Sequence, residues 1–456
     1  MSGGGRKGGG QATRGAPVGG DAYVPTSGDV RWSATHYDLA IDYRVATNRL
    51  DGVARIAGRA EVELAAIELD LAGLRASRAS IDGERVRPVQ RGARLVLQPP
   101  APIPAGTAFE LEVAYAGSPA PRRSSWGLVG WEELEDGVIV ASQPTGSPSW
   151  FPCNDRPSNK ATYRIRVTAE QPYRVVATGV LVDESTSSGR TTRTFECRTP
   201  TATYLTTVHI GRYVRRSRTH SDVRLVAYHP AALERRVRAD LAPLPAMLDC
   251  FVDRFGPYPF DDYTVVVTPD ELEIPLESHA AAVFGANHID GRGGEERLIA
   301  HELAHQWFGN SVGVRSWQHI WLNEGLACYA EWLWSDASGR ESADELAALH
   351  HRRLAALPQD LVLGDPGPER MFDDRIYKRG ALLVHALRIE LGDVRFFELL
   401  HEWAARNAAS TADTDDFRRL AEQVAGRSLD ALLDAWLLDP ALPPLPERGG
   451  GRSPRR

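Results

Sequence analysis

The chain has 456 residues, of which 43% are hydrophobic, and its formal net charge at pH 7 is -7. This length predicts two or three domains, and the apolar content is sufficient for complete hydrophobic cores. The acidic balance argues against nucleic acid as a general partner. No apolar run approaches the ~20 residues that a membrane-spanning helix needs, so no membrane partner is expected.

The four cysteines are widely spaced and form no C-x-x-C pair. They are Cys153, Cys197, Cys250 and Cys328. Such cysteines are expected to be small buried apolar side chains in a reducing compartment, which favours a cytoplasmic location.

Both ends of the chain are predicted to be disordered tails. Residues 1–20 are rich in glycine and carry no apolar stretch of the kind that a secretory signal needs. Residues 446–456 form a short basic segment that is expected to be solvated.

Residues 21–215 are predicted to form an antiparallel β domain. Segments 37–43, 109–113 and 162–168 alternate apolar and polar residues, and turn residues lie between them. This alternation is typical of strands with one solvated face.

Residues 216–445 are predicted to form a second, mainly helical domain. A strand is expected at 264–268, and helical patterns dominate from about residue 294. Residues 396–403 and 417–424 show apolar spacing with a period of 3.6. The fold class is therefore expected to be α+β with several domains.

The second domain contains the pattern H-E-x-x-H at His301, Glu302 and His305. Two histidines four residues apart on a helix project from one face, about one turn apart. Eighteen residues separate His305 from Glu324, which leaves room for a loop and a second helix to return a carboxylate. Two histidines and one glutamate form a catalytic zinc site with an open position, and Glu302 can act as general base. We therefore expect one Zn²⁺ per chain.

The pattern H-E-x-x-H has only three fixed positions, so it also occurs by chance. The alternative to a zinc site is an amphipathic helix whose histidines are buried and hydrogen-bonded. The flanking apolar residues and the sequence Asn323-Glu324-Gly325 favour the zinc site. Glu331 lies seven residues after Glu324, on the same helical face, and could accept the N–H of a ligand imidazole. Its alternative is a solvated surface glutamate.

The sequence HELAHQWFGN at 301–310, followed by WLNEG at 321–325, resembles the zinc aminopeptidases of peptidase family M1, the aminopeptidase N and leukotriene hydrolase type. The resemblance runs from about residue 30 to about residue 440. Residues 150–162 are similar to the family's Pro-Cys-x-Asp-x-Pro-Ser-x-Lys-Ala segment, and residues 36–39 are similar to its first strand. The resemblance implies a thermolysin-like catalytic domain after the β domain.

Residues 377–381 are similar to the family's Tyr-Glu-Lys-Gly-Ala segment. The resemblance implies that the Tyr377 hydroxyl stabilises the oxyanion of the reaction. Core packing is the alternative role for Tyr377.

One family signature is altered. Where the family has Gly-x-Met-Glu-Asn, this chain has residues 274–278, in which Glu277 is kept. The resemblance implies that Glu277 binds the α-amine of the substrate. Strand alternation places Glu271 and Glu273 on the same face, so register alone does not choose among the three. Pro275 lacks an N–H and cannot donate a backbone hydrogen bond.

The family's second group for the amine is Gln-x-Glu or Gln-x-Gln, and this chain has Gln143 and Thr145 at those positions. The resemblance implies that Gln143 binds substrate. Because Thr145 replaces an acidic or amide side chain, weaker binding of the amine is expected.

The expected function is that of a zinc-dependent aminopeptidase acting on peptides with a free N-terminus. The family's C-terminal helical domain is absent from this sequence, so a more open site is expected. An inactive interaction scaffold is one alternative, but it predicts loss of a zinc ligand, of Glu302 or of Tyr377, and all are present. The other is a hydrolase of a non-peptide substrate such as an epoxide, which one branch of the family performs.

Overall fold

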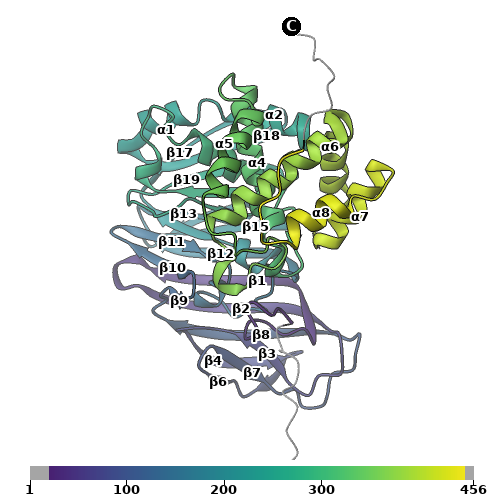
Figure 1. Ribbon diagram of the computed structural model, residues 1–456. Helices are drawn as coiled ribbons and strands as arrows, with labels where there is room; N and C mark the ends of the chain where they lie inside the picture. Colours follow the sequence, from purple (N-terminus) through teal and green to yellow (C-terminus); the bar gives the residue numbers. More distant parts are fainter. Residues whose placement is uncertain (1–19, 447–456) are drawn as a thin grey trace, which may run out of the picture.

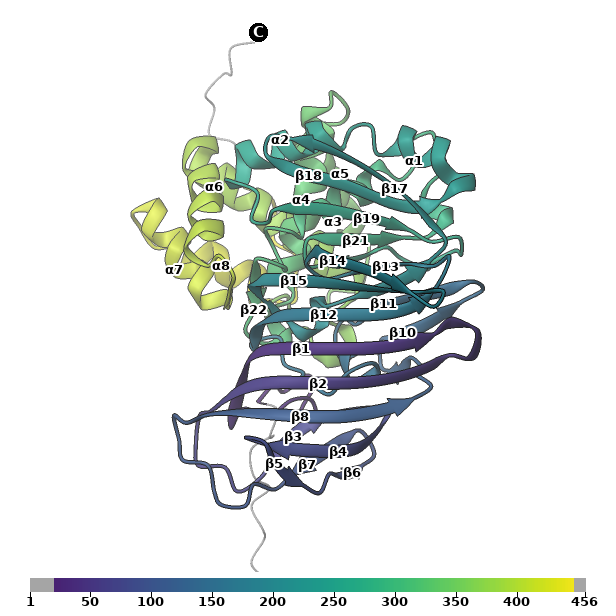
Figure 2. The same cartoon turned by 180° about the vertical axis from the view of Figure 1, so that it is seen from behind.

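The computed structural model describes residues 20–446. The predicted tails therefore lie outside the described residues, apart from Gly20 and Pro446. Figures 1 and 2 show a β-rich N-terminal part below a sheet that helices cover on one face. The predicted domain limits at 215/216 and 445/446 remain predictions.

The largest sheet has eight strands and forms the broad surface seen in Figure 2. In order across the sheet the strands are β14 (Val180–Ser187), β15 (Arg190–Ala202), β12 (Lys160–Glu170), β1 (Trp32–Arg44), β2 (Arg49–Ala60), β8 (Ala108–Gly117), β4 (Arg75–Ile81) and β5 (Glu84–Val86). Along β1, Tyr37, Leu39 and Ile41 are buried and the residues between them are partly exposed. This period of two is the predicted pattern of a sheet with one solvated face.

The strand pairing departs from the prediction at one place. The other pairs of neighbours in the eight-stranded sheet are antiparallel, but β1 and β12 are parallel, with Tyr37 opposite Tyr163. Local alternation shows that a segment is a strand, but it carries no information on the direction of a partner more than a hundred residues away.

Two smaller sheets complete the N-terminal part. A five-stranded sheet contains β13 (Arg174–Ala177), β16 (Val208–Gly211), β11 (Gly137–Ala141), β10 (Gly127–Leu134) and β9 (Arg122–Ser124). A three-stranded sheet contains β3 (Ile67–Asp70), β7 (Arg94–Leu97) and β6 (Val89–Arg91).

The C-terminal part is built on a mixed five-stranded sheet. Its order is β17 (Tyr213–His220), β18 (Val223–Pro230), β19 (Asp262–Val267), β21 (Ala281–Phe284) and β20 (Leu276–Ser278). One face packs on the N-terminal part through a cluster that includes Ile139, Val176, Tyr228 and Val283. Helices cover the other face (Figure 2). Strand β20 is the last strand at one edge of this sheet.

The helices are α1 (Glu234–Asp240), α2 (Leu244–Phe255), α3 (Glu296–Ala304), α4 (Trp321–Ala337), α5 (Ala343–Ala355), α6 (Asp374–Arg406), α7 (Thr414–Ala425) and α8 (Asp430–Leu437). Helices α1 and α2 lie between β18 and β19 in the chain, and the helices from α3 onward follow the sheet, as the sequence predicted. Short strands β22 (Val312–Val314) and β23 (Ser410–Ala412) pair beside them. Gly392 interrupts α6 with a φ of 73°, and Gly426 ends α7 with a φ of 70°, as expected of glycines at helix ends. Within the described residues, no helix is both long and apolar enough to cross a membrane.

Helices α4 and α6 touch at two glycines. A Cβ built on Gly325 would lie 2.8 Å from the Cα of Gly380, and a Cβ on Gly380 would lie equally close to the Cα of Gly325. Gly325 follows Glu324 in sequence, and Gly380 lies three residues after Tyr377. The contact between the two glycines therefore sets how close the side chains of Glu324 and Tyr377 lie to each other.

We expect Gly325→Ala to destabilise the protein, because its methyl group would overlap backbone that cannot move aside. Overpacking of this kind typically costs ~1–3 kcal/mol, which outweighs the ~1 kcal/mol that alanine gains over glycine in a helix. Urea unfolding of the zinc-loaded protein measures the change. An unchanged or increased free energy of unfolding would show that the two helices can separate without cost.

Candidate metal centre

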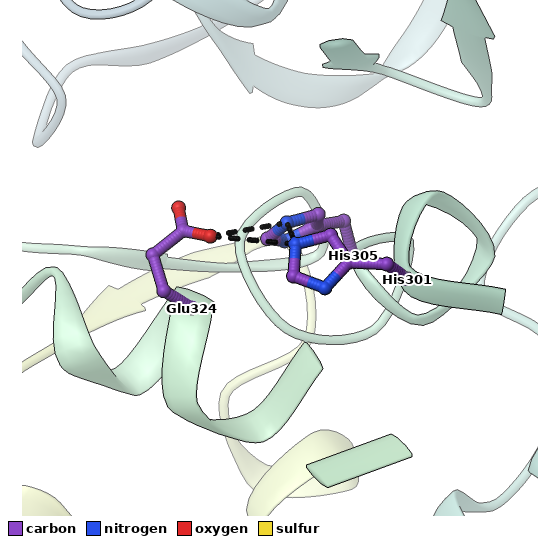
Figure 3. Close-up of side chains that lie close together, drawn as sticks. All are labelled: His301, His305 and Glu324. Carbon is purple, nitrogen blue, oxygen red and sulfur yellow. Dashed lines mark hydrogen bonds and ion pairs between the residues drawn. The ribbon is translucent and has the colours of Figure 1, made fainter. Parts of the chain in front are cut away.

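Two helices bring the three predicted metal ligands together. His301 lies in the last turn of α3, His305 follows directly after the end of that helix, and Glu324 lies in the first turn of α4. Their exposed fractions are only 8%, 1% and 3%. Figure 3 shows the two imidazoles and the carboxylate pointing toward one another. The loop and second helix that the spacing predicted are both present.

The distances among the three ligand groups fit a tetrahedral cation. The Nε2 atoms of His301 and His305 are 3.0 Å apart, and they lie 3.6 and 3.4 Å from Oε2 of Glu324. A tetrahedron with zinc–ligand arms of ~2.0–2.1 Å has edges of about 3.3–3.4 Å. Two imidazoles and one carboxylate form a ligand set typical of catalytic zinc. These residues therefore fit one Zn²⁺ per chain.

Each imidazole is held through its other nitrogen. Nδ1 of His301 lies 2.7 Å from Oε1 of Glu331, and Nδ1 of His305 lies 3.0 Å from the carbonyl oxygen of Phe308. Because both partners are acceptors, each Nδ1 carries the hydrogen and each Nε2 presents a lone pair to the cation. Arg297 donates to the second oxygen of Glu331 at 3.1 Å. The predicted role of Glu331 as an acceptor is confirmed.

We expect Glu331→Gln to weaken zinc binding ~10–100-fold, since loss of such an outer partner lowers metal affinity by that amount. The amide can still accept from His301, but it no longer bears the charge that makes the imidazole a stronger ligand. Competition with a chelator measures the affinity. The exposed Glu273→Gln is a matched control, and equal affinities in both variants would remove Glu331 from this role.

Glu302 lies on α3 between the two histidine ligands and is 3% exposed. Its Oε2 atom is buried and has no hydrogen-bond partner among the described residues. A buried carboxylate oxygen without a partner is costly. The structure thus places Glu302 beside the metal ligands, while its role as general base stays a prediction.

Tyr377 lies in the first turn of α6, with its ring beside His301. The two ring centroids are 6.2 Å apart and the planes are inclined by 25°. Burial raises the pKa of the Tyr377 hydroxyl well above its ordinary value, and the nearby Glu324 and Glu277 raise it further. The hydroxyl therefore keeps its proton and can donate it in a hydrogen bond. The structure places Tyr377 at the metal centre, as the sequence predicted, while its catalytic role stays a prediction.

Gln143 and Glu277 meet at β20, the edge strand of the mixed five-stranded sheet. Nε2 of Gln143 donates to Oε1 of Glu277 at 2.7 Å, and Glu277 lies on the edge strand β20. Glu277 is 6% exposed, whereas Glu271 and Glu273 are exposed to solvent. Glu277 is thus the one of the three carboxylates that is buried, and its binding of the α-amine stays a prediction.

Lys160 is a residue of the site to which the sequence assigned no role. In the structure it holds the loop that follows α3. Lys160 begins β12 in the N-terminal part, and its Nζ donates to the carbonyl oxygens of Asn310 and Ser311 at 3.0 and 2.7 Å. These carbonyls belong to the loop that also supplies the Phe308 acceptor for His305. Burial lowers the pKa of Lys160 to about 7. The similarity of segment 150–162 to a family motif was the only indication in the sequence.

The fold and the ligand set together define a two-domain zinc metallopeptidase. Residues 33–205 match the model of the Peptidase M1 N-terminal domain, and residues 243–436 match that of the Peptidase family M1 domain. The chain therefore belongs to peptidase family M1, in a form with an N-terminal domain and a catalytic domain.

Solved structures of similar organisation come from Deinococcus radiodurans. An M1 zinc metallopeptidase from this organism is 32% identical, with a TM-score of 0.88 over 95% of this chain and 100% of that chain. A mutant of that enzyme bound to the substrate Tyr-Ser-Ala has the same identity, TM-score and coverage.

Curated relatives are longer. Leucyl aminopeptidase of Saccharolobus solfataricus is 23% identical over 89% of this chain and 53% of its own length. Human endoplasmic reticulum aminopeptidase 1 is 27% identical over 84% of this chain and 44% of its own length. The chain thus spans about half the length of these curated relatives.

Proposed function

We propose that the chain is a zinc-dependent aminopeptidase that removes the N-terminal residue from peptides with a free α-amine. The observation that carries this proposal is the pair of Gln143 and Glu277, 2.7 Å apart at the edge strand of the sheet that lies beside α3. A buried carboxylate there can bind an ammonium group of a substrate whose next peptide bond reaches the metal ligands.

Each residue of the site has a separate task in the proposed reaction. When bound at His301, His305 and Glu324, a Zn²⁺ ion polarises a carbonyl and makes its water a nucleophile at neutral pH. Glu302 takes the proton of the attacking water at Oε2, which has no hydrogen-bond partner in the described part of the chain, and delivers it to the leaving amine. Tyr377 donates its hydroxyl hydrogen to the oxygen on which negative charge develops.

The relatives support this assignment. The Deinococcus structure holds the peptide substrate Tyr-Ser-Ala, and the two curated relatives are aminopeptidases by name. The carboxylate of Glu277 on β20 gives the selectivity a physical basis, since an acetylated N-terminus is neutral and gains nothing from this charge. We also propose a cytoplasmic location, because all four cysteines are buried free thiols, as expected of a reducing compartment. Cell fractionation would test it.

If the chain is an exopeptidase, acetylating the substrate amine should lower kcat/KM ~10–100-fold. This factor corresponds to the loss of one hydrogen bond to a charged group, which contributes ~1.5–3 kcal/mol. Glu277→Ala should lose a similar factor on free peptides and little more on acetylated ones. Aminoacyl-coumarin substrates with and without the acetyl group measure both, and Glu273→Ala is the matched exposed control. If acetylated peptides are cut as well as free ones, or internal bonds are cut first, the chain is an endopeptidase.

A further inference from the structure

A cavity lies at the edge of the five-stranded sheet that is opposite to β20 and the metal centre. It opens between the outer strands β17 and β18 and the segment from α1 to the start of α2, and its volume is about 360 Å³. This is within the range of ~300–1,000 Å³ that is usual for small-molecule sites. In Figure 2, α1 and β17 occupy one upper corner of the molecule.

The floor of this cavity is apolar. Leu225 comes from β18, Val237 from α1, and Leu241 and Leu244 from the turn into α2. All four side chains are at least nine-tenths buried. Ala227 lies beside Leu225 on the same face of β18 and leaves space above the floor because its side chain is short. A chain of methylene groups could therefore be removed from water here.

The mouth of the cavity is positively charged. Three arginines, Arg216, Arg218 and Arg238, border it together with a single carboxylate, Glu234. Nε of Arg216 donates to Glu234 at 3.0 Å, and Arg218 donates to the carbonyl oxygen of Leu241 at 3.1 Å. Within residues 20–446, the Arg238 guanidinium has no hydrogen-bond or ion-pair partner. One carboxylate thus faces three guanidinium groups, and the mouth carries an excess of positive charge.

This cavity is separate from the metal centre. Strand β17 is one edge of the five-stranded sheet, and β20, which carries Glu277, is the other. Four strand spacings of ~4.8 Å put about 19 Å between the two edges. A ligand in the cavity would therefore not contact the zinc ligands.

We propose that this cavity binds an anionic amphiphile, an unbranched alkyl carboxylate of medium chain length. Its chain lies on Leu225, Val237, Leu241 and Leu244, and its carboxylate pairs with Arg238. Guanidinium groups bind carboxylates through two parallel hydrogen bonds, which fixes the direction of the ligand. The combination of an apolar floor with a cationic mouth distinguishes this ligand class from a cationic or a purely apolar one.

Calorimetric titration of the full-length, zinc-loaded protein with decanoate tests the proposal. The metal centre is first saturated with an amino-acid hydroxamate, so that carboxylate binding to zinc does not contribute. We expect one decanoate per chain and no binding of acetate or of decyltrimethylammonium. If decanoate does not bind, binds only without the hydroxamate, or binds no better than the cationic amphiphile, the proposal is wrong.

Three variants locate the site. Arg238→Gln should weaken decanoate binding at least ~10-fold, as expected for loss of a charge-assisted pair. Arg235→Gln, which changes an exposed arginine of the same helix that does not line the cavity, should bind as the wild type does. Ala227→Trp fills the cavity and should abolish binding while peptide hydrolysis continues. Undiminished binding in Arg238→Gln would overturn the proposal even if Ala227→Trp fails to fold.

Discussion

Glu302→Gln should lower kcat ~10²–10⁴-fold, the usual contribution of a general base, while the protein keeps one zinc ion per chain. The glutamine has the same shape as the glutamate, but it cannot take a proton from the attacking water. Glu302 is not one of the three metal ligands, whose side chains come together without it. Zinc content and catalysis should therefore separate in this variant.

Elemental analysis of the purified variant and initial rates on an unblocked aminoacyl-coumarin measure the two quantities. Glu341→Gln, a change of an exposed glutamate, is the matched control and should behave as the wild type does. Activity of Glu302→Gln within a few-fold of the control would show that another group takes the proton. Loss of zinc together with activity would show that Glu302 is needed to assemble the centre.

The metal ligands could be predicted from the sequence because their geometry is local. His301 lies in the last turn of α3 and His305 directly follows that helix with helical backbone angles, so their spacing alone places both imidazoles on one side. The partner of His301 was also predictable, since Glu331 lies two turns after Glu324 on the same helix. Within one helix, the period of 3.6 residues shows which side chains lie on the same face.

Other parts of the site depend on contacts between distant segments. Gln143 and Glu277 are 134 residues apart in the chain, and only the resemblance to a family suggested that they act together. Strand alternation allowed three carboxylates, and the choice of Glu277 required knowing which one the sheet edge buries. Lys160 reaches the loop after α3 from the other domain. The local spacing of apolar and polar residues does not show which distant segments come into contact. For the same reason it did not predict that β1 and β12 pair in parallel.

Tyr377→Phe should lower kcat ~10²–10³-fold, as removal of one hydrogen-bond donor to a developing oxyanion does, and should change KM much less. The ring of Tyr377 lies beside His301, with its centroid 6.2 Å from the centroid of the imidazole. Within the described residues, no hydrogen bond to its hydroxyl group is present, so the donor is free for a substrate. An interaction that strengthens only as charge develops affects kcat rather than the binding of the ground state.

The hydroxyl oxygen is the only non-hydrogen atom that this substitution removes, so packing of the ring on His301 is preserved. Tyr213→Phe is a matched control, because the Tyr213 hydroxyl is buried without a partner in the described structure and belongs to the cluster between the two domains. That control should keep full activity, whereas the Tyr377 variant should keep its zinc and its stability but lose turnover. If kcat is unchanged in Tyr377→Phe, Tyr377 serves to pack against the metal ligand, and stabilisation of the oxyanion falls to the bound cation alone.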